Sequence, residues 1–220
     1  NATVSNLHLY DTQIYHSGSV SNVVIGSIAG VSGASQINNC SVDSFKSTKR
    51  TQTADGTPIT ATYNDTAYDY YLVPDFLEYS STNNCVVGGL IGRVTGKGNI
   101  SQCEVNGKIS VNKGSGIGNI VGEIYDSANR SETVGISNVT GSSVIVTPDN
   151  GYMYNVGGVV GRIKSVNTSV SISNVGTAEK DYSVIFNGKS FCGSGNDSTG
   201  YGGFGGIVGY NLSKSILIDD

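Results

Sequence analysis

The chain has 220 residues, of which 37% are apolar and 14% are charged, and its formal net charge at pH 7 is −4. Disordered chains are usually rich in charge or proline, whereas this one has 31 glycines and 3 prolines, so its composition argues for a folded domain. The acids are scattered, no basic stripe is present and no apolar run approaches the roughly 20 residues of a membrane helix, which argues against nucleic acid as a partner and against a helical membrane span.

The first strand-like segment, Val4 to Leu7, looks like a partial copy of a unit that recurs later in the chain. The only two histidines, His8 and His16, follow it and could meet on adjoining strands to hold a metal ion. Solvated or packed histidines are far more common, and the sequence contains no H-E-x-x-H motif. We therefore expect no metal site and no cofactor.

Five later segments share one pattern, in which an apolar residue, Gly, a small residue and two apolar residues are followed by Gly. They span residues 25–30, 87–92, 117–122, 156–161 and 204–209. Each is followed by a second strand-like piece, which begins at Ile37, Ile100, Ile136, Ile172 or Ile216. In the first four of these pieces, the residue two positions later is Asn or Gln, and the next is Cys or Val. A third apolar piece completes several units, at residues 109–111, 144–146 and 184–186.

Self-similarity of this kind is typical of proteins in which each repeat stacks on its neighbours. Three short strands per unit, rich in β-branched residues, indicate a chain that winds once and stacks on the previous winding. We therefore predict an all-β fold, a single parallel β-solenoid domain over residues 1–220. We expect it to be a three-sided, right-handed β-helix of about five coils, with two insertions at about residues 45–84 and 178–203.

The glycines of the pattern are expected to make narrow corners, because stacked glycines let the apolar columns close in. Asn-Gly pairs at residues 106–107, 150–151 and 187–188 are expected to supply further corners with positive φ. Strict alternation would place the column of residues 29, 91, 121, 160 and 208 outside the coil. Either a bend at the glycine turns this column inward, or it forms an external apolar stripe.

The first insertion is rich in tyrosines and acids. The residues that could form a ligand site in it are Tyr63, Tyr68, Tyr70, Tyr71, Asp65 and Asp69. Aromatic rings beside carboxylates can bind sugars, and two carboxylates held roughly 5 to 9 Å apart can hydrolyse a glycosidic bond. The alternative, which we favour, is that these tyrosines pack against the wall of the solenoid.

The chain has four cysteines, Cys40, Cys85, Cys103 and Cys192, and the last lies in the second insertion. An even number without a C-x-x-C pair disfavours zinc and leaves two interpretations, structural disulfides or buried free thiols. Cys40 and Cys103 occupy the same repeat position, so their Cα atoms should lie about 5 Å apart, within the range of a disulfide. We expect these two to be bonded or at least stacked, and the pairing of Cys85 and Cys192 stays open.

Nine Asn-x-Ser/Thr sequons occur, about twice the number expected by chance from the composition. Asn64, Asn129, Asn167 and Asn196 lie in insertions or turns and are the expected glycosylation sites. Asn39 and Asn138 lie within expected strands, where stacking leaves less room. With the even cysteine count, the sequons favour an extracellular or cell-surface location.

The repeat resembles the GLUG motif of bacterial surface proteins, including the non-catalytic region of some immunoglobulin A peptidases. Residues 87–109 carry the resemblance best, and the insertions fall outside it. The resemblance implies a β-helical stalk or adhesin-like region and supplies no active-site residues.

These observations predict a structural or adhesive module and not an enzyme. The competing interpretation is a carbohydrate-binding or polysaccharide-processing β-helix that uses the first insertion. The chain begins within a repeat at Val4 and stops within one at residues 215–219, so both ends carry apolar, strand-competent sequence. We expect it to act as a repeating unit or a segment of a stalk or filament. Its expected partners are further copies of itself, joined head to tail or laterally, other surface proteins, or glycans.

Overall fold

The structure is a computed structural model that describes residues 2–10, 12–18, 20–44, 60–63, 66–69, 75–80, 84–126, 128, 130–147, 151–177, 180, 182–187 and 202–219. These residues form strands, bends and turns, and no helix is found among them. The expected all-β class is confirmed. The described part of the chain accordingly contains no helix long and apolar enough to cross a membrane.

The chain passes five times through the same series of strand positions, and we call each passage a layer. Layer one consists of β1 (Ala2–Ser5), β2 (His8–Tyr10), β3 (Ile14–His16), β4 (Val23–Gly26) and β5 (Ala29–Ser32). Layer two consists of β6 (Ser35–Asn38), β7 (Ser41–Asp43), β10 (Asp75–Tyr79), β11 (Cys85–Gly88) and β12 (Ile91–Val94). Layer three consists of β13 (Gly98–Ser101), β14 (Glu104–Val111), β15 (Lys113–Gly118) and β16 (Val121–Ile124).

The later layers repeat this order. Layer four consists of β17 (Thr133–Val139), β18 (Gly141–Val146), β19 (Tyr152–Met153), β20 (Asn155–Gly157) and β21 (Val160–Ile163). Layer five consists of β22 (Ser169–Val175), β23 (Tyr182–Asn187), β24 (Gly203–Gly205) and β25 (Val208–Asn211). One further strand, β26 (Ser215–Asp219), pairs with β22. A separate antiparallel hairpin is formed by β8 (Thr60–Tyr63) and β9 (Thr66–Asp69).

Equivalent strands of successive layers pair in parallel and build four sheets. Their strand orders are β1-β6-β13-β17-β22-β26, β2-β7-β14-β10-β3 with β18 and β23, β4-β11-β15-β20-β24 with β19, and β5-β12-β16-β21-β25. The three-sided outline that we predicted is therefore wrong. Each glycine pattern was interpreted as one strand, but it forms two, because the chain bends sharply between its two glycines and the two halves enter different sheets.

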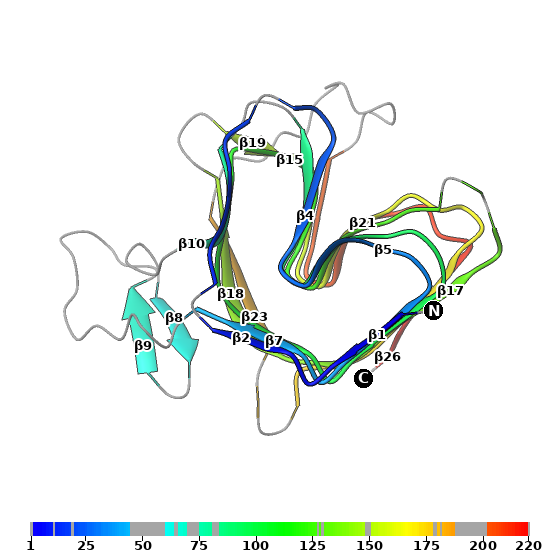
Figure 1. The fold of residues 1–220 in the computed structure, drawn as a ribbon, viewed down its shortest axis with the longest axis horizontal. Coiled ribbons are helices and arrows are strands. Elements are labelled where there is room, and N and C mark those ends of the chain that lie inside the picture. Colours follow the sequence, from blue (N-terminus) through cyan, green and yellow to red (C-terminus); the bar gives the residue numbers. More distant parts are fainter. Residues whose placement is uncertain are drawn as a thin grey trace.

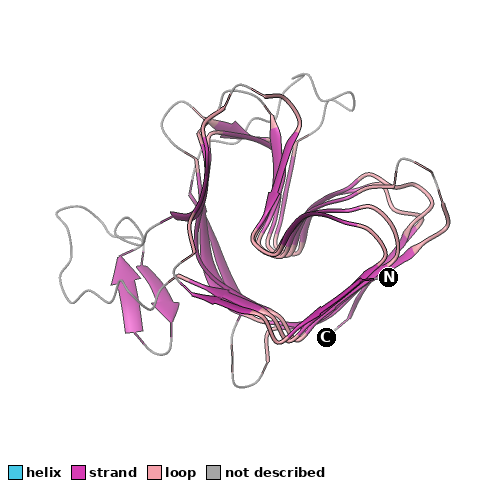
Figure 2. Ribbon diagram, viewed as in Figure 1, coloured by secondary structure: helices cyan, strands magenta, loops and turns pink. Residues whose placement is uncertain are grey.

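Viewed along the stack, the layers superpose on one outline with an inward fold (Figure 1). The strands stacked with β4 run into the outline, and those stacked with β5 run back out of it (Figure 2). Val87 of β11 pairs with Ile25 on one side and Ile117 on the other, which is the alignment of repeats read from the sequence. Val156 and Phe204 continue this column into layers four and five, so the predicted register is confirmed.

The glycines are required because backbone approaches backbone at the inward fold. A Cβ on Gly88 would lie 1.9 Å from the carbonyl oxygen of Ile91, and one on Gly92 would lie 2.6 Å from those of Gly30 and Ile25. The resulting bend turns both apolar residues that precede the last glycine of the pattern inward. Leu90 and Ile91 are both fully buried, so the bend, and not an external apolar stripe, explains the second apolar column in the middle layers.

A second corner is made by polar residues with positive φ. The equivalent positions at the end of the first strand of each layer have φ between 51° and 57°, and they are Asn6, Asn39, Gln102, Asn138 and Asn174. The first three follow their strands, whereas the last two lie one residue before the end of β17 and β22. Asn tolerates this left-handed conformation better than other residues with a side chain. The amides of adjacent layers also bond, since Asn39 Nδ2 donates to Asn6 Oδ1 at 2.7 Å and Asn174 Nδ2 donates to Asn138 Oδ1 at 3.0 Å.

This asparagine corner takes the role that we assigned to the Asn-Gly pairs. Gly107 does have a positive φ, of 141°, but it lies within β14 and marks no corner between strands. Asn187 ends β23, and Asn150 and Gly188 lie outside the described residues.

Both insertions are shorter than expected, because each expected range contains a strand of the layered structure. Residues 75–79, inside the first expected insertion, form β10, which pairs with β3 and with β14. Tyr79 of β10 is fully buried and stacks on His16, with ring centroids 5.4 Å apart. Residues 182–187, inside the second, form β23 and pair with β18.

Candidate functional site

A polar groove lies on the outer face of the sheet formed by β2, β7 and β14, and encloses about 310 Å³. Its lining includes His8, Tyr10, Asp43, Glu104, Asn106 and Lys180. The groove therefore combines residues of layers one, two and three with a lysine from the segment that links β22 to β23.

Strand alternation explains why these side chains meet. Leu9 of β2, Val42 of β7 and Val105 of β14 pack into the core, so the residues on either side of them face outward. The parallel register aligns His8 with Ser41 and Glu104. It also aligns Tyr10 with Asp43 and Asn106.

The floor of the groove is held by hydrogen bonds across three layers. Lys180 Nζ donates to Glu104 Oε2 at 2.9 Å, and Asn106 Nδ2 donates to Glu104 Oε1 at 2.9 Å. The other end of the Asn106 amide accepts a hydrogen bond from Ser142 N at 2.8 Å. Both oxygens of Glu104 are thus engaged, and the side chain is fixed in place.

The remaining groups supply a mixture of donors and acceptors. His8 Nδ1 lies 2.8 Å from Ser41 Oγ, and Tyr10 is 51% exposed. Asp43 is buried and has polar interactions of its own. With two carboxylates and one ammonium group, the groove has a net charge near −1 when His8 is neutral. Such a site suits hydroxyl groups or a cation better than an anion.

A row of charges on β12, β16 and β21 was not anticipated from the sequence. The register aligns Arg93, Glu123 and Arg162 in successive layers. Arg93 Nε donates a hydrogen bond to Glu123 Oε2 at 2.5 Å. Arg162 Nε forms an ion pair with Glu123 Oε1 at 2.7 Å, but its N–H does not point at that oxygen as a hydrogen bond requires. The Glu123 side chain is only 1% exposed and that of Arg162 only 8%. The residue after the second glycine of each pattern, Arg, Glu and Arg in turn, was the signal that could have revealed this row.

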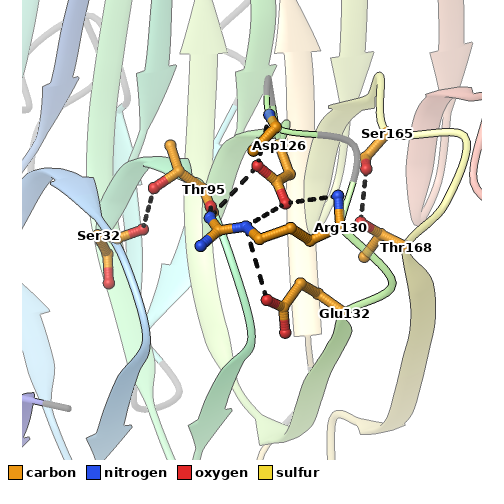
Figure 3. A network of polar contacts seen from close by, with 8 residues as sticks. Ser32, Thr95, Asp126, Arg130, Glu132, Ser165 and Thr168 are labelled. Carbon is orange, nitrogen blue, oxygen red and sulfur yellow. Dashed lines mark hydrogen bonds and ion pairs between the residues drawn. The ribbon is translucent and has the colours of Figure 1, made fainter.

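A third polar cluster stabilises the segment that connects β16 of layer three to β17 of layer four (Figure 3). Asp126 accepts hydrogen bonds from the backbone of Ala128 and Arg130 and from Arg130 Nε at 3.0 Å. Arg130 also donates to the carbonyl oxygen of Thr95 at 3.1 Å and lies 3.8 Å from Glu132. The hydrogen bond from the Arg130 side chain lowers the pKa of Asp126 below its ordinary value. Asp126 thus fixes a turn, which is a structural role.

The tyrosines and acids predicted as a ligand site are only partly described. Tyr63, Tyr68 and Asp69 belong to the β8–β9 hairpin, where Ala61 pairs with Tyr68 and Thr60 with Asp69. Asp65, Tyr70 and Tyr71 lie outside the described residues. The ligand site proposed for this insertion therefore stays a prediction.

Cys40, Cys85 and Cys103 are buried free thiols, and Cys192 lies outside the described residues. Cys40 and Cys103 do stack in adjacent layers, since Glu104 N donates to the Cys40 carbonyl, but they form no disulfide. In a parallel, in-register column the Cα–Cβ bonds point the same way, so the Cβ atoms stay about 4.8 Å apart, beyond the roughly 3.5 to 4.5 Å that a disulfide needs. Burial raises the pKa of Cys85 and raises that of Cys103 to about 11.

Of the four expected glycosylation sites, Asn167 lies half-buried in the turn between β21 and β22. Asn64, Asn129 and Asn196 fall outside the described residues. Asn39 and Asn138 are exposed at the asparagine corner and are not covered by stacking. Their amides are engaged in the corner hydrogen bonds, and glycosylation at any of the sequons stays a prediction.

The two histidines have separate partners, Ser41 for His8 and Tyr79 for His16. Within the described ranges, no group of three or more His, Cys, Asp or Glu residues is arranged to hold a metal ion.

Comparison with known proteins gives one match. Residues 83–110 match the model of a family described as the GLUG motif. This segment contains β11, β12, β13 and most of β14, so the matched motif runs from one layer into the next and includes the glycine bend. The resemblance noted in the sequence is confirmed for these residues. No curated protein and no solved structure matches the chain.

Proposed function

We propose that the chain is a structural module without catalytic activity: a segment of a parallel β-solenoid whose ends are continued by further β-layers in an extracellular stalk or filament. The GLUG motif and the parallel stacking of five layers support this proposal. Stacks of this kind bury a continuous core only while each layer has a neighbour on both sides.

One column of isoleucines carries the proposal. The inward positions Ile37, Ile100, Ile136 and Ile172 are buried in layers two to five. Ile218 of β26 pairs with Ile172 and continues the same column, but it is 52% exposed. The side chain therefore stands where a core residue would stand if another layer covered it.

The rest of that end is also open. A cavity of about 550 Å³ is lined by Val175, Val184, Phe186, Ile207 and Ile218, the inward residues of the last layer. Among the described residues, the exposed large apolar side chains other than Val166 all belong to layer one or follow residue 203. An open apolar cavity at the end of a stack, together with an unpaired strand edge, favours the addition of further β-structure.

We propose a second copy of the chain as the occupant in solution, because its first layer presents the complementary edge. Sedimentation of the purified chain should show an average mass that rises with concentration. Ile218→Lys places a charge in the exposed core position and should shift the chain to monomer. Val166→Lys, at a turn residue that is 54% exposed, serves as the control and should leave association unchanged. A monomer at all concentrations, or equal effects of the two variants, would overturn the proposal.

The extracellular location rests on the sequons and has its own test. Intact-mass measurement on material from the native source should give a mass above that of the bare polypeptide, which is 22.8 kDa for these residues. A mass equal to that of the unmodified chain would remove the support that glycosylation gives to secretion.

A further inference from the structure

We propose that the groove on β2, β7 and β14 binds a neutral saccharide. This is a binding site separate from the assembly of layers, and it differs in place from the insertion considered in the sequence. The groove exists in the first three layers whether or not the ends associate, so its test is independent of the proposed function.

The chemistry of the lining favours a ligand with several hydroxyl groups. A carboxylate accepts two hydrogen bonds side by side, an amide accepts and donates, and an ammonium group donates. Glu104 and Lys180 present the carboxylate and the ammonium group at the groove, with side chains 23% and 57% exposed, and the buried Asn106 amide holds Glu104 in place beneath them. A sugar ring carries hydroxyl groups that both donate and accept, so it can match such a mixture without leaving a charge of its own unpaired.

The aromatic residues provide the apolar part of a sugar site. Tyr10 is half exposed at the groove, and its ring offers a flat apolar face with a hydroxyl group at the edge. His8 stands in the same strand, and hydrogen bonding to Ser41 orients its ring. The C–H face of a sugar can lie against such rings while its hydroxyl groups reach the floor.

The size and the charge of the groove indicate which saccharides it can bind. A volume of about 310 Å³ is at the lower end of the range for ligand pockets, which fits one or two sugar rings. Asp43 and Glu104 outweigh the single positive charge of Lys180, so uronic acids and phosphates would be repelled. The floor is already held by hydrogen bonds, so little ordering is needed on binding.

The test uses saturation-transfer NMR on the whole chain, with glucose, galactose, N-acetylglucosamine and lactose as neutral probes and glucuronic acid as the anionic counterpart of glucose. At least one neutral probe should bind with a dissociation constant in the millimolar range or below. Glucuronic acid should bind more weakly than glucose. If no neutral probe binds, or if glucuronic acid binds as well as glucose, the proposal fails.

Matched variants locate the site. Tyr10→Ala should weaken binding of the neutral probe about tenfold, because the ring contact is lost. Tyr15→Ala is the control, since Tyr15 is 62% exposed in the next strand of the same layer and does not line the groove. Glu104→Gln should also weaken binding. Thermal unfolding midpoints of the two tyrosine variants should equal that of the parent chain, and equal binding by both variants would place the sugar elsewhere.

Discussion

At the scale of single residues, the row formed by Arg93, Glu123 and Arg162 is the strongest electrostatic feature of the stack. Burial removes Glu123 from water, and an unpaired carboxylate there would be costly. The two guanidinium groups approach it from the layers above and below, so each layer depends on its neighbours for charge compensation. The row therefore favours the observed register over any slip between layers.

Removing Glu123 should be far more harmful than removing a surface acid. Glu123→Ala leaves two arginines facing each other and should lower the free energy of unfolding by about 3 kcal/mol or more. Glu132→Ala, which removes a partly exposed acid 3.8 Å from the exposed Arg130, should cost less than about 1 kcal/mol. Urea denaturation of the two variants makes the comparison, and similar losses would show that the buried row contributes no more than a surface pair.

The buried thiols predict a loss of stability at high pH. The folded-state pKa of Cys103 is about 11, above the ordinary value of 9.0, so the protonated thiol contributes stability that is fully present below pH 9. This contribution is lost as the pH rises toward 11, because the unfolded chain then releases the proton more readily. The parent chain should lose about 2 kcal/mol more than Cys103→Ser over this interval. If the free energies of unfolding of the two proteins fall equally between pH 9 and pH 11, the thiol is not buried as described.

At the scale of elements, the glycine bend decides how closely two sheets approach. Gly88 and Gly92 allow the backbones of β11 and β12 to meet without intervening side chains, and the same bend recurs in every layer. The inward fold of the outline follows from these contacts (Figure 1).

A methyl group at this bend should disrupt the packing. Gly92→Ala would place Cβ 2.6 Å from two backbone carbonyl oxygens, which cannot move without shifting a neighbouring strand. We expect the variant to lower the free energy of unfolding by about 2 kcal/mol or more. Gly33→Ala is the control, because a Cβ there meets nothing within 4 Å. Equal stability of the two variants would mean that the sheets are not in backbone contact.

The repeat made part of this arrangement predictable. The glycine pattern and the first four Ile positions, Ile37, Ile100, Ile136 and Ile172, aligned the layers correctly, because equivalent residues must stack in register. The fifth position was wrong, since Ile216 pairs with Val170 and it is Ile218 that pairs with Ile172. The pattern could not reveal the fourth sheet, since one short apolar segment can be a single strand or two strands separated by a bend. β10 was hidden for another reason, because it follows a long insertion and lacks the glycine signal.

The candidate site was harder to predict. His8, Glu104 and Lys180 are far apart in the sequence and meet only because three layers and one connection converge. The charged row did have a signal, because Arg93, Glu123 and Arg162 each follow the last glycine of the repeat pattern. The burial of Glu123 between the two arginines follows only from the stacking of the layers. The asparagine corner was visible as a recurring Asn or Gln, but its positive φ follows from the geometry of the corner.

At the scale of the whole molecule, the middle layers are closed and the ends are open. Core positions in layers two to four are fully buried, whereas the cavity beside Ile218 marks a surface where stacking stops. In a stack of parallel strands these ends are the positions where another layer can add with unchanged register. The groove and the charged row lie on the side walls, so they would remain in place along an extended stack.

Electron cryomicroscopy of the native assembly is the most direct test of this account. We expect an extended particle in which parallel strands continue across both ends of the described layers at a spacing of about 4.8 Å, with Ile218 covered by another layer. Separate particles that remain single at high concentration, with the end cavity open to solvent, would contradict it.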